Sequence, residues 1–425
     1  MRKRFLLVLC VLAVMVAAGS VGAANWPQWR GPELNGFSPE TDLPTEFGPD
    51  RNVAWKAALP GDGGSTPIIW EDRVFISAQD GDRKTWAMCL SADDGSVLWK
   101  HRVGTGFTNR QGNTACSPSP VTNGEWVVFL YGNGDLVGYT MDGAEMWSRN
   151  LQEDHGEWDY LSDYGASGLL HDGKLYIPVL HGRLKTGPPE EPRSYLLCVD
   201  PKTGEDLWKH MRPSDAAYEC KQAYTTPTLI EHDGEKQILI HGADHVTGHN
   251  PEDGSELWRS PTYNPGGSKW YRTVCSPVYA DGMVLISASR GNGLFAIKPG
   301  TSTWAWTRRQ GSPDVPTPLV YKNDFYILAD KSKRMLRIEP QTGETLDECR
   351  LGGRTMMQAS PTGADGKIYG MNMGGEVYVV DAKGKMEVVH TVDMGGRGCR
   401  STIAVSGGKL FIRAQDTLYC IGKEG

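Results

Sequence analysis

Short apolar runs and glycine-containing turns alternate along the chain, and one phrase of this kind recurs about every fifty residues. The phrase is an apolar strand, a turn with Gly, and a second strand that usually ends in Trp. No stretch shows an extended helical period, so repeats of this size are typical of a β-propeller. The clear copies span residues 89–100, 138–148, 197–209 and 248–259, and weaker copies span 296–307, 337–349 and 379–389.

A second phrase, a Ser/Thr-Pro pair that opens a strand, interleaves with the first. Each opening precedes a two-residue turn, often Asp-Gly or Asn-Gly, which favours a hairpin because both residues tolerate positive φ. We therefore predict eight units of four antiparallel strands, A to D. The openings are Ser65-Thr66-Pro67, Ser117-Pro118, Ala166-Ser167, Thr226-Pro227, Ser276-Pro277, Thr317-Pro318, Ser360-Pro361 and Arg400-Ser401-Thr402, and the turns include Glu71-Asp72, Asp172-Gly173 and Asn323-Asp324.

Seven D strands follow the eight openings, and the missing one lies at the other end of the chain. Residues 52–56 form an isolated strand in which Trp55 takes the place of the repeat Trp. We expect this strand to pair with the last unit, residues 399–421, because ring closure removes the exposed sheet edges. The fold prediction is an all-β, eight-bladed β-propeller of four-stranded antiparallel blades.

The repeat Trp residues have a structural interpretation. A large indole at the end of strand D fills the space between neighbouring blades, and the repeat period explains its recurrence without a ligand. These residues are Trp55, Trp99, Trp147, Trp208, Trp258 and Trp306.

The first 23 residues have the pattern of a signal peptide. Arg2, Lys3 and Arg4 precede an apolar run over residues 5–18, and small residues follow before position 24. Cys10 follows Leu9 and lacks the small residue expected before a lipid-modified cysteine. We therefore expect an exported protein, periplasmic or extracellular, with a signal peptide (1–23), an N-terminal extension (24–51) and one propeller domain (52–425).

Charge and cysteine content restrict the partners. Without the three basic residues of the leader, 41 of the 44 Lys and Arg remain against 51 Asp and Glu, a net charge near −10. This balance excludes nucleic acid as an expected partner, and no later run is long enough to span a bilayer. Six of the eight cysteines outside the leader fall at repeat-equivalent positions of different units, so most pairs are too far apart to bridge and we expect buried thiols. We also expect a monomer.

Strand order predicts which face carries function. If strand A starts at the upper end, the short A–B and C–D turns lie at one face and the longer D–A and B–C connections lie at the other. The longer connections are rich in Arg, His, Asp and aromatic residues, and loops on a rigid scaffold commonly carry function. We therefore predict a polar, aromatic-lined funnel there, whose candidate binding residues are Arg110, Asp159, Tyr164, Tyr224, His241, His245, Trp270, Arg272, Arg290, Arg354 and Arg400.

Several chemistries suit this funnel. The arginines need an acidic counterpart, either a carboxylate ligand or Asp159, Asp163 and Asp314 of the chain itself, of which internal pairing is favoured. Candidate ligands of a divalent metal are Asp154-His155, His181, His241 and Asp244-His245, which lie in neighbouring units, although their spacing matches no known pattern. The aromatic residues can stack a planar ring or a sugar, or pack the loops.

The phrase Cys-x-Asp-x-x-Thr-Gly-x-x-x-Trp at residues 198–208 resembles the tryptophan-docking repeat of pyrroloquinoline-quinone-type propellers. The opening Trp26-Pro-Gln-Trp-Arg-Gly-Pro32, followed by residues 52–56, looks like secreted quinoprotein-like proteins abundant in planctomycete-type bacteria. In the enzymes of this family, pyrroloquinoline quinone and calcium occupy the axial funnel beside an Asp base, for which Asp159, Asp163 or Asp314 are candidates. This chain lacks their adjacent cysteines. Another branch of the family is the scaffold subunit of outer-membrane β-barrel assembly, which binds proteins without a cofactor.

Three functions remain from the sequence. We favour a non-catalytic exported binding scaffold, with a protein or glycan partner at the funnel and no cofactor. The alternatives are a quinone- and calcium-dependent dehydrogenase, or a propeller that binds or cleaves carbohydrate with its aromatic residues and pairs such as Glu157 and Asp159.

Overall fold

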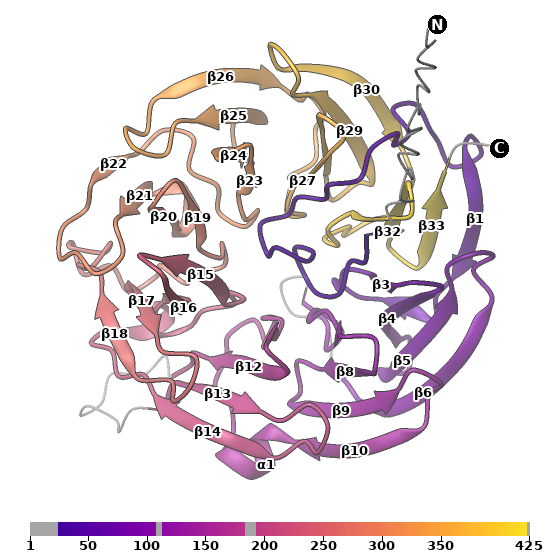
Figure 1. Ribbon diagram of the computed structural model, residues 1–425, viewed down its shortest axis with the longest axis horizontal. Coiled ribbons are helices and arrows are strands. Elements are labelled where there is room, and N and C mark those ends of the chain that lie inside the picture. Colours follow the sequence, from indigo (N-terminus) through magenta and orange to yellow (C-terminus); the bar gives the residue numbers. More distant parts are fainter. Residues whose placement is uncertain (1–23, 108–112, 183–192, 423–425) are drawn as a thin grey trace, which may run out of the picture.

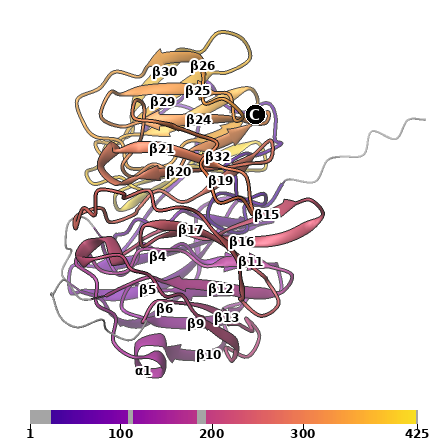
Figure 2. The same ribbon diagram turned by 90° about the vertical axis from the view of Figure 1, so that its left-hand side faces the viewer.

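The chain folds into a ring of eight four-stranded antiparallel sheets in the computed structural model, which describes residues 24–107, 113–182 and 193–422 (Figure 1). Figure 2 shows the ring from the side. The predicted eight-bladed all-β architecture is therefore confirmed.

Within each blade the strands follow the chain from the axis to the rim. Blade 1 contains β3 (Ile68–Trp70), β4 (Arg73–Asp80), β5 (Lys84–Ser91) and β6 (Val97–Thr105), and β2 (Gly61–Asp62) joins β4 at the end of the blade. Blades 2 to 4 are β7 (Val121–Thr122), β8 (Trp126–Leu130), β9 (Asp135–Thr140), β10 (Glu145–Asn150); β11 (Leu169–His171), β12 (Lys174–Val179), β13 (Tyr195–Val199), β14 (Asp206–Met211); and β15 (Thr228–His232), β16 (Glu235–Gly242), β17 (His245–His249), β18 (Glu256–Arg259).

The later blades repeat this order, and short helices occur only in connections of the described chain. Blades 5 to 7 are β19 (Val278–Ala280), β20 (Met283–Ala288), β21 (Gly293–Ile297), β22 (Trp306–Arg308); β23 (Leu319–Tyr321), β24 (Asp324–Ala329), β25 (Arg334–Ile338), β26 (Thr345–Arg350); and β27 (Thr362–Ala364), β28 (Lys367–Met371), β29 (Glu376–Asp381), β30 (Glu387–Asp393). The helices are α1 (Leu151–His155), η1 (Tyr218–Lys221) and η2 (Ser289–Gly291).

Blade 8 closes the ring by joining the two ends of the chain. Its inner strands are β31 (Ala404–Ser406), β32 (Lys409–Ala414) and β33 (Thr417–Ile421), and its outer strand is β1 (Val53–Ala58). β1 runs antiparallel to β33 with Trp55 opposite Cys420. The isolated N-terminal strand therefore completes the last blade, as predicted.

The repeat Trp side chains join each blade to the next. Four indoles donate their Nε1–H to a carbonyl in the C–D turn of the following blade, at distances of 2.8 to 3.0 Å. The Gly of that turn lies against the ring, where an added Cβ would come within 2.3 to 2.7 Å of it, so no larger residue fits without movement. The bonded pairs are Trp55–Ala92, Trp99–Met141, Trp147–Pro201 and Trp306–Pro340, and the ring-to-glycine pairs are Trp55–Gly95, Trp99–Gly143, Trp147–Gly204, Trp208–Gly254 and Trp306–Gly343.

Other side chains take this place where the repeat degenerates. Asp347 of β26 accepts the backbone N–H of Met386 in blade 7 at 2.6 Å. His390 of β30 lies 3.0 Å from the carbonyl of Phe47, in the N-terminal extension, and stacks at a tilt on its ring. Trp258 differs, because it packs between blades 4 and 5 but donates its N–H to Gln237 of its own blade.

The cysteines on C strands accompany these indoles. Cys89, Cys198 and Cys420 are the cross-strand partners of Trp99, Trp208 and Trp55. A small residue here leaves space for the indole beside it, which explains their repeat-equivalent positions. All eight described cysteines are free thiols, and all except the half-buried Cys349 are buried.

A ring of hydrogen bonds surrounds the axis where the A strands begin. In six consecutive interfaces the backbone N–H of the Ser or Thr at the strand opening donates to the hydroxyl of its counterpart in the next blade, at 2.9 or 3.0 Å. The series runs Thr66, Ser119, Ser167, Thr226, Ser276, Thr317 and Ser360. The predicted opening at Ser117-Pro118 was therefore wrong by two residues, because Ser119-Pro120 occupies the ring. The turn predicted at Asn323-Asp324 lies at Lys322-Asn323, whose φ values are 50° and 64°.

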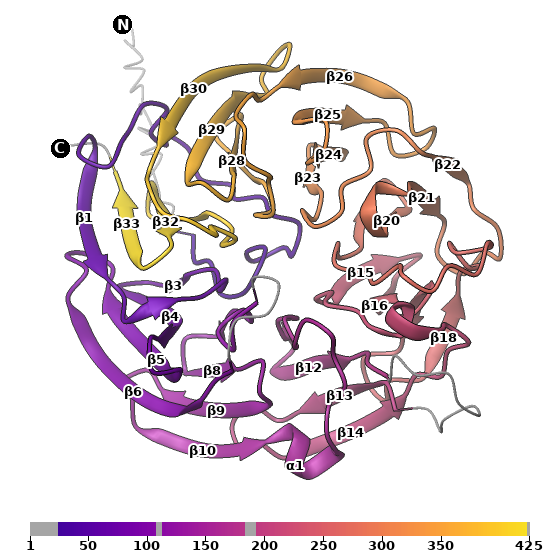
Figure 3. The same ribbon diagram turned by 180° about the vertical axis from the view of Figure 1, so that it is seen from behind.

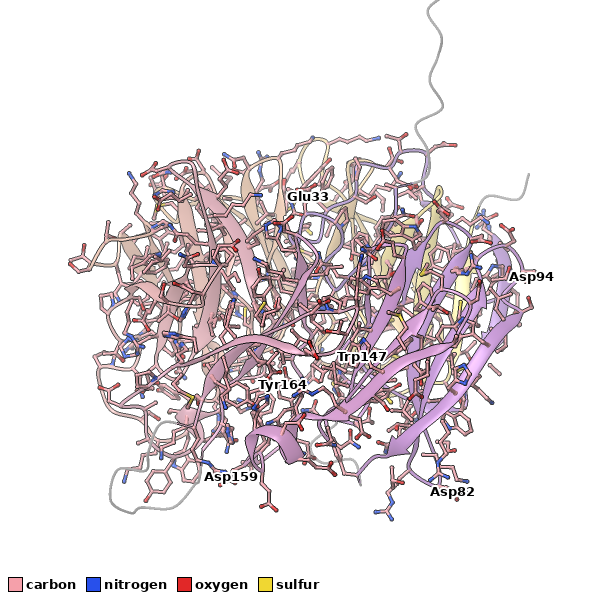
Figure 4. The ribbon with its side chains drawn as sticks, turned by 60° about the horizontal axis from the view of Figure 1, so that its bottom comes forward. Glu33, Asp82, Asp94, Trp147, Asp159 and Tyr164 are labelled. Carbon is pink, nitrogen blue, oxygen red and sulfur yellow. The ribbon has the colours of Figure 1, made fainter. Side chains whose placement is uncertain are left out.

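The ring has two distinct faces. The short-turn face carries the A–B and C–D turns, and the long-loop face carries the D–A and B–C connections, as the sequence predicted. Figure 4 shows Asp82 on the turn after β4 and Asp159 on the loop after α1 at one edge of the molecule, with Glu33 of the N-terminal extension toward the opposite edge. Figure 3 shows the ring from behind, with α1 on the side toward the viewer.

The N-terminal extension crosses the short-turn face and reaches the centre of the ring there (Figure 1). Trp26 bridges to Ile69 of blade 1, and Gln28 exchanges hydrogen bonds with Leu170 of blade 3. The buried guanidinium of Arg30 then donates to the carbonyls of Pro318 in blade 6 and Pro361 in blade 7, at 2.5 and 2.6 Å. The extension thereby links opposite sides of the ring.

Replacing Trp55 by Ala should destabilise the ring by about 3–5 kcal/mol, because the change empties a buried site at the closing interface and removes its hydrogen bond to Ala92. Urea unfolding followed by circular dichroism measures the shift in midpoint. The control is Trp270→Ala, at a side chain that is 51% exposed, for which a change within about 0.5 kcal/mol is expected. Equal shifts for the two variants would contradict the docking role.

Candidate funnel on the long-loop face

Two repeat positions line the axial cavity. The first lies two residues before the Ser or Thr of each strand opening, and the second is that Ser or Thr itself in seven of the eight repeats. Strand alternation directs both positions toward the axis. The cavity has a volume of about 120 Å³, and Trp29 of the N-terminal extension is part of its lining. The position two residues before the Ser or Thr contributes Gly64, Ser117, Gly165, Tyr224, Val274, Val315, Gln358 and Arg400.

A second cavity of about 240 Å³ adjoins the first on the long-loop face, and Gly64 and Arg400 line both. Arg397 and Arg400 come from the loop between blades 7 and 8, and Asp62 comes from the connection between blades 8 and 1. We call this second cavity the arginine cavity. Its remaining lining residues are Gly63, Thr114, Gly398 and Gln415.

Arg400 is held in place by neutral groups. Its Nε donates to Gln358 Oε1 at 2.6 Å and its Nη1 to the Gly398 carbonyl at 3.3 Å. Burial lowers the pKa of Arg400, while Cys399 and Asp62 partly oppose that shift. An arginine remains cationic at neutral pH even so. Arg400 thus brings a positive charge to the axis.

Two other predicted arginines pair within the chain. Arg272 forms an ion pair with Asp314 at 3.2 Å, and Arg290 approaches the buried carboxylate of Glu219 at 3.4 Å. Asp314 also accepts the backbone N–H of Arg290 at 2.6 Å. The internal pairing favoured from the sequence is therefore confirmed for Arg272 and Asp314, and this network ties the loops of blades 3 to 6 together.

The predicted tyrosines belong to a packed aromatic cluster. Tyr164 is buried, donates to the Pro178 carbonyl at 3.0 Å, and lies 4.6 Å from Trp158 between ring centroids. Tyr224 donates to Gln222 and accepts from the backbone N–H of Ser162, both at 3.3 Å. Of the two, only Tyr224 lines the axial cavity.

The four candidate metal histidines have separate partners. His155 lies 3.1 Å from Asp206, and His181 Nδ1 accepts the backbone N–H of Asp159 at 3.0 Å. His241 and His245 each direct Nδ1 to a backbone carbonyl at 2.9 Å. Across the described ranges no group of three or more His, Cys, Asp or Glu side chains could hold a metal ion. The described residues therefore do not bring these candidate ligands together as a metal site.

The remaining candidates are placed as follows. Trp270 and Arg354 are exposed on D–A loops, and Met356 beside Arg354 is 56% exposed. Asp159 uses its backbone carbonyl to accept from Gly182 and Gln222. Arg110 lies outside the described residues. The funnel brings Tyr224 and Arg400 together with Gln358 and Asn113. Sequence analysis did not name Gln358 and Asn113 as candidates, although both lie in the predicted loops.

A wider groove of about 550 Å³ lies at the same face between blades 4 and 5. Tyr263 and Tyr271 come from the loop after blade 4, and Phe295, Arg308 and Arg309 come from blade 5. β22 has only three residues, so the end of β21 is left beside this groove. Sequence analysis did not predict this groove, because the repeat pattern does not show where the outer strand ends.

The axial residues do not fit a calcium-bound quinone. Hard cations such as Ca²⁺ need several oxygen ligands, commonly carboxylates. The described lining of the axial cavity contains no carboxylate, and its one charged side chain is an arginine. The residues present therefore offer no cation site at the axis.

The comparisons with known proteins agree on the family and the fold. The family model described as outer membrane protein assembly factor BamB matches residues 49–187 and 192–425. A curated relative, outer membrane protein assembly factor BamB of Yersinia pestis, is 20% identical over 245 residues, which are 57% of this chain and 53% of the relative. That match therefore spans about half of the relative's length.

Solved propellers share the fold at low identity. BamB from Moraxella catarrhalis is 14% identical with a TM-score of 0.57, covering 87% of this chain and 96% of that one. A europium-containing methanol dehydrogenase is 10% identical with a TM-score of 0.65, covering 92% and 89%. Quinohemoprotein alcohol dehydrogenase from Comamonas testosteroni is 11% identical with a TM-score of 0.62, covering 95% and 81%. In the described part of this chain, no helix is long and apolar enough to cross a bilayer.

Acid should destabilise the protein through His241, and His241→Gln should reduce that effect. Burial lowers the pKa of His241 to about 3, against roughly 6.5 in the unfolded chain. Between these values only the unfolded chain takes up this proton, so stability falls as the pH falls, by up to about 1.4 kcal/mol per pH unit. Urea unfolding of both proteins between about pH 7 and pH 4.5 measures the two slopes.

The difference between these slopes isolates His241. His249 and Asp244 have displaced pKa values of about 4 and about 6, but both residues titrate in either protein. Identical slopes for the two proteins would contradict the buried, neutral state assigned to His241.

Proposed function

The chain belongs to the family described as outer membrane protein assembly factor BamB, and we propose that it is an exported, non-catalytic binding scaffold of the cell envelope. It engages a protein partner through the long-loop face. Export is supported by the leader-like residues 1–23, and the finer relationship to secreted proteins of planctomycete-type bacteria remains part of this proposal.

The contrast between the two faces carries this proposal. The short-turn face is covered by the N-terminal extension, whereas the long-loop face exposes Trp270, Met356 and Arg354 on its D–A loops. Aromatic residues, Met and Arg are enriched in protein interfaces, and a rigid ring presents them with little ordering cost. The small axial cavity leaves these loops as the broad surface available to a macromolecule.

Photo-crosslinking tests the face that binds. With p-benzoylphenylalanine at position 270 or 356, we expect crosslinks in cells to a subunit of the outer-membrane β-barrel assembly apparatus, identified by mass spectrometry. The matched control is position 207 on the outer strand of blade 3, where Leu207 is 48% exposed. Crosslinks from position 207 alone, or crosslinks to unrelated abundant proteins from all three positions, would contradict the proposal.

Reconstitution tests the absence of quinone catalysis. The purified chain, mixed with pyrroloquinoline quinone and calcium and then desalted, should retain no quinone absorbance and reduce no dye with alcohols or sugars, because none of the described residues that line the axial cavity is a carboxylate. Stoichiometric retention with dye reduction would instead identify a dehydrogenase.

Carbohydrate binding is the second candidate, and one observation favours it. The exposed Trp270 ring lies 5.9 Å from Tyr218, and Lys269 stands 4.7 Å above the Tyr218 ring. Such a platform can stack a sugar ring. A glycan array that binds the native chain and loses Trp270→Ala would support this function over protein binding.

A further inference from the structure

Positive charge is concentrated where the arginine cavity meets the axis. Arg397 and Arg400 line this cavity, and no described carboxylate forms an ion pair with either side chain. The guanidinium of Arg397 has no hydrogen-bond partner among the described residues, and Arg400 bonds only to neutral groups. Both arginines therefore retain capacity for an anion.

A third guanidinium stands behind the cavity wall. Arg413 is buried, and its four hydrogen bonds go to three backbone carbonyls and the Ser65 hydroxyl. An added Cβ on Gly63, a lining residue, would come within 2.7 Å of this guanidinium. The positive charge of Arg413 therefore lies directly behind the wall of the arginine cavity, and all its hydrogen-bond partners are neutral groups.

Asp62 only partly balances these charges. It lines the arginine cavity and acts on Arg400 and Arg413 at a distance, but forms no ion pair with either side chain. The exposed Asp416 also acts on Arg413. Three guanidinium groups against these two carboxylates leave a positive potential in the recess, which attracts an anionic group.

We propose that the arginine cavity is a carboxylate-binding site in which Arg397 and Arg400 hold the ligand between blades 7, 8 and 1. A guanidinium matches the two oxygens of a carboxylate. The cavity, at about 240 Å³, is below the range of roughly 300–1,000 Å³ typical of drug-sized ligands, which suits a small dicarboxylate or one acidic side chain. Asp62 disfavours a dianionic phosphate group at the same place.

This site goes beyond the scaffold function and stands without it, because a free small carboxylate fills the cavity with no protein partner present. The loss of crosslinks in cells and the loss of carboxylate binding by the pure chain are separate results. Each proposal can therefore fail alone.

Calorimetric titration of the full chain with succinate, a hexaglutamate peptide and inorganic phosphate tests the site at low salt. We expect saturable binding of at least one carboxylate probe, weakened roughly tenfold or more by Arg400→Gln and by Arg397→Gln. Asp62→Asn should strengthen binding, because it removes the opposing charge. Arg354→Gln is the matched control, since it removes the same charge from the same face but lines neither cavity.

The probes also distinguish the source of the carboxylate. Binding of succinate alone supports a free metabolite, and binding of the peptide alone supports an acidic segment of a protein. No saturable binding of either, an equal loss in Arg354→Gln, or tighter binding of phosphate would overturn the proposal. Because Arg397 is exposed, Arg397→Gln keeps the test decisive even if Arg400→Gln unfolds.

Discussion

The contact between an indole and the glycine turn of the next blade sets the geometry of the whole ring. A blade alone exposes both faces of its sheet, and the docked Trp covers part of the face that meets the next blade while donating its N–H across that interface. The turn must contain Gly because the ring lies where a Cβ would be. Asp347 and His390 preserve a polar contact at the same place, so the constraint concerns the position more than the residue type.

Much of the fold could be predicted from the chain because the repeat positions are local and periodic. Residues that line the axis could also be predicted, since one set of them falls two residues before each Ser or Thr of the strand openings. The roles of the buried Arg30, Arg212 and Arg413 could not be predicted, because these side chains bond to backbone carbonyls, which have no signature in sequence. The carbonyl acceptors of Arg30 in blades 6 and 7 lie about 300 residues away along the chain.

The two faces divide stability from recognition. On the short-turn face the side chains of Gln28 and Arg30 in the N-terminal extension join opposite blades, and Trp29 lines the axial cavity. On the long-loop face the connections vary in length and carry the arginine cavity, the groove between blades 4 and 5, and the exposed Trp270. Function is therefore free to vary on loops while the docking contacts remain the same.

The pairing of β1 with β33 has a consequence for the order of synthesis. β1 precedes the other strands of the ring, but its partner β33 is the last strand of the propeller to be synthesised. Until β33 appears, blade 8 is incomplete and both ends of the array present open strand edges, which invite aggregation. A propeller closed in this way therefore keeps open edges until its last blade is synthesised, whereas the early units of an open repeat array pair with neighbours as they emerge.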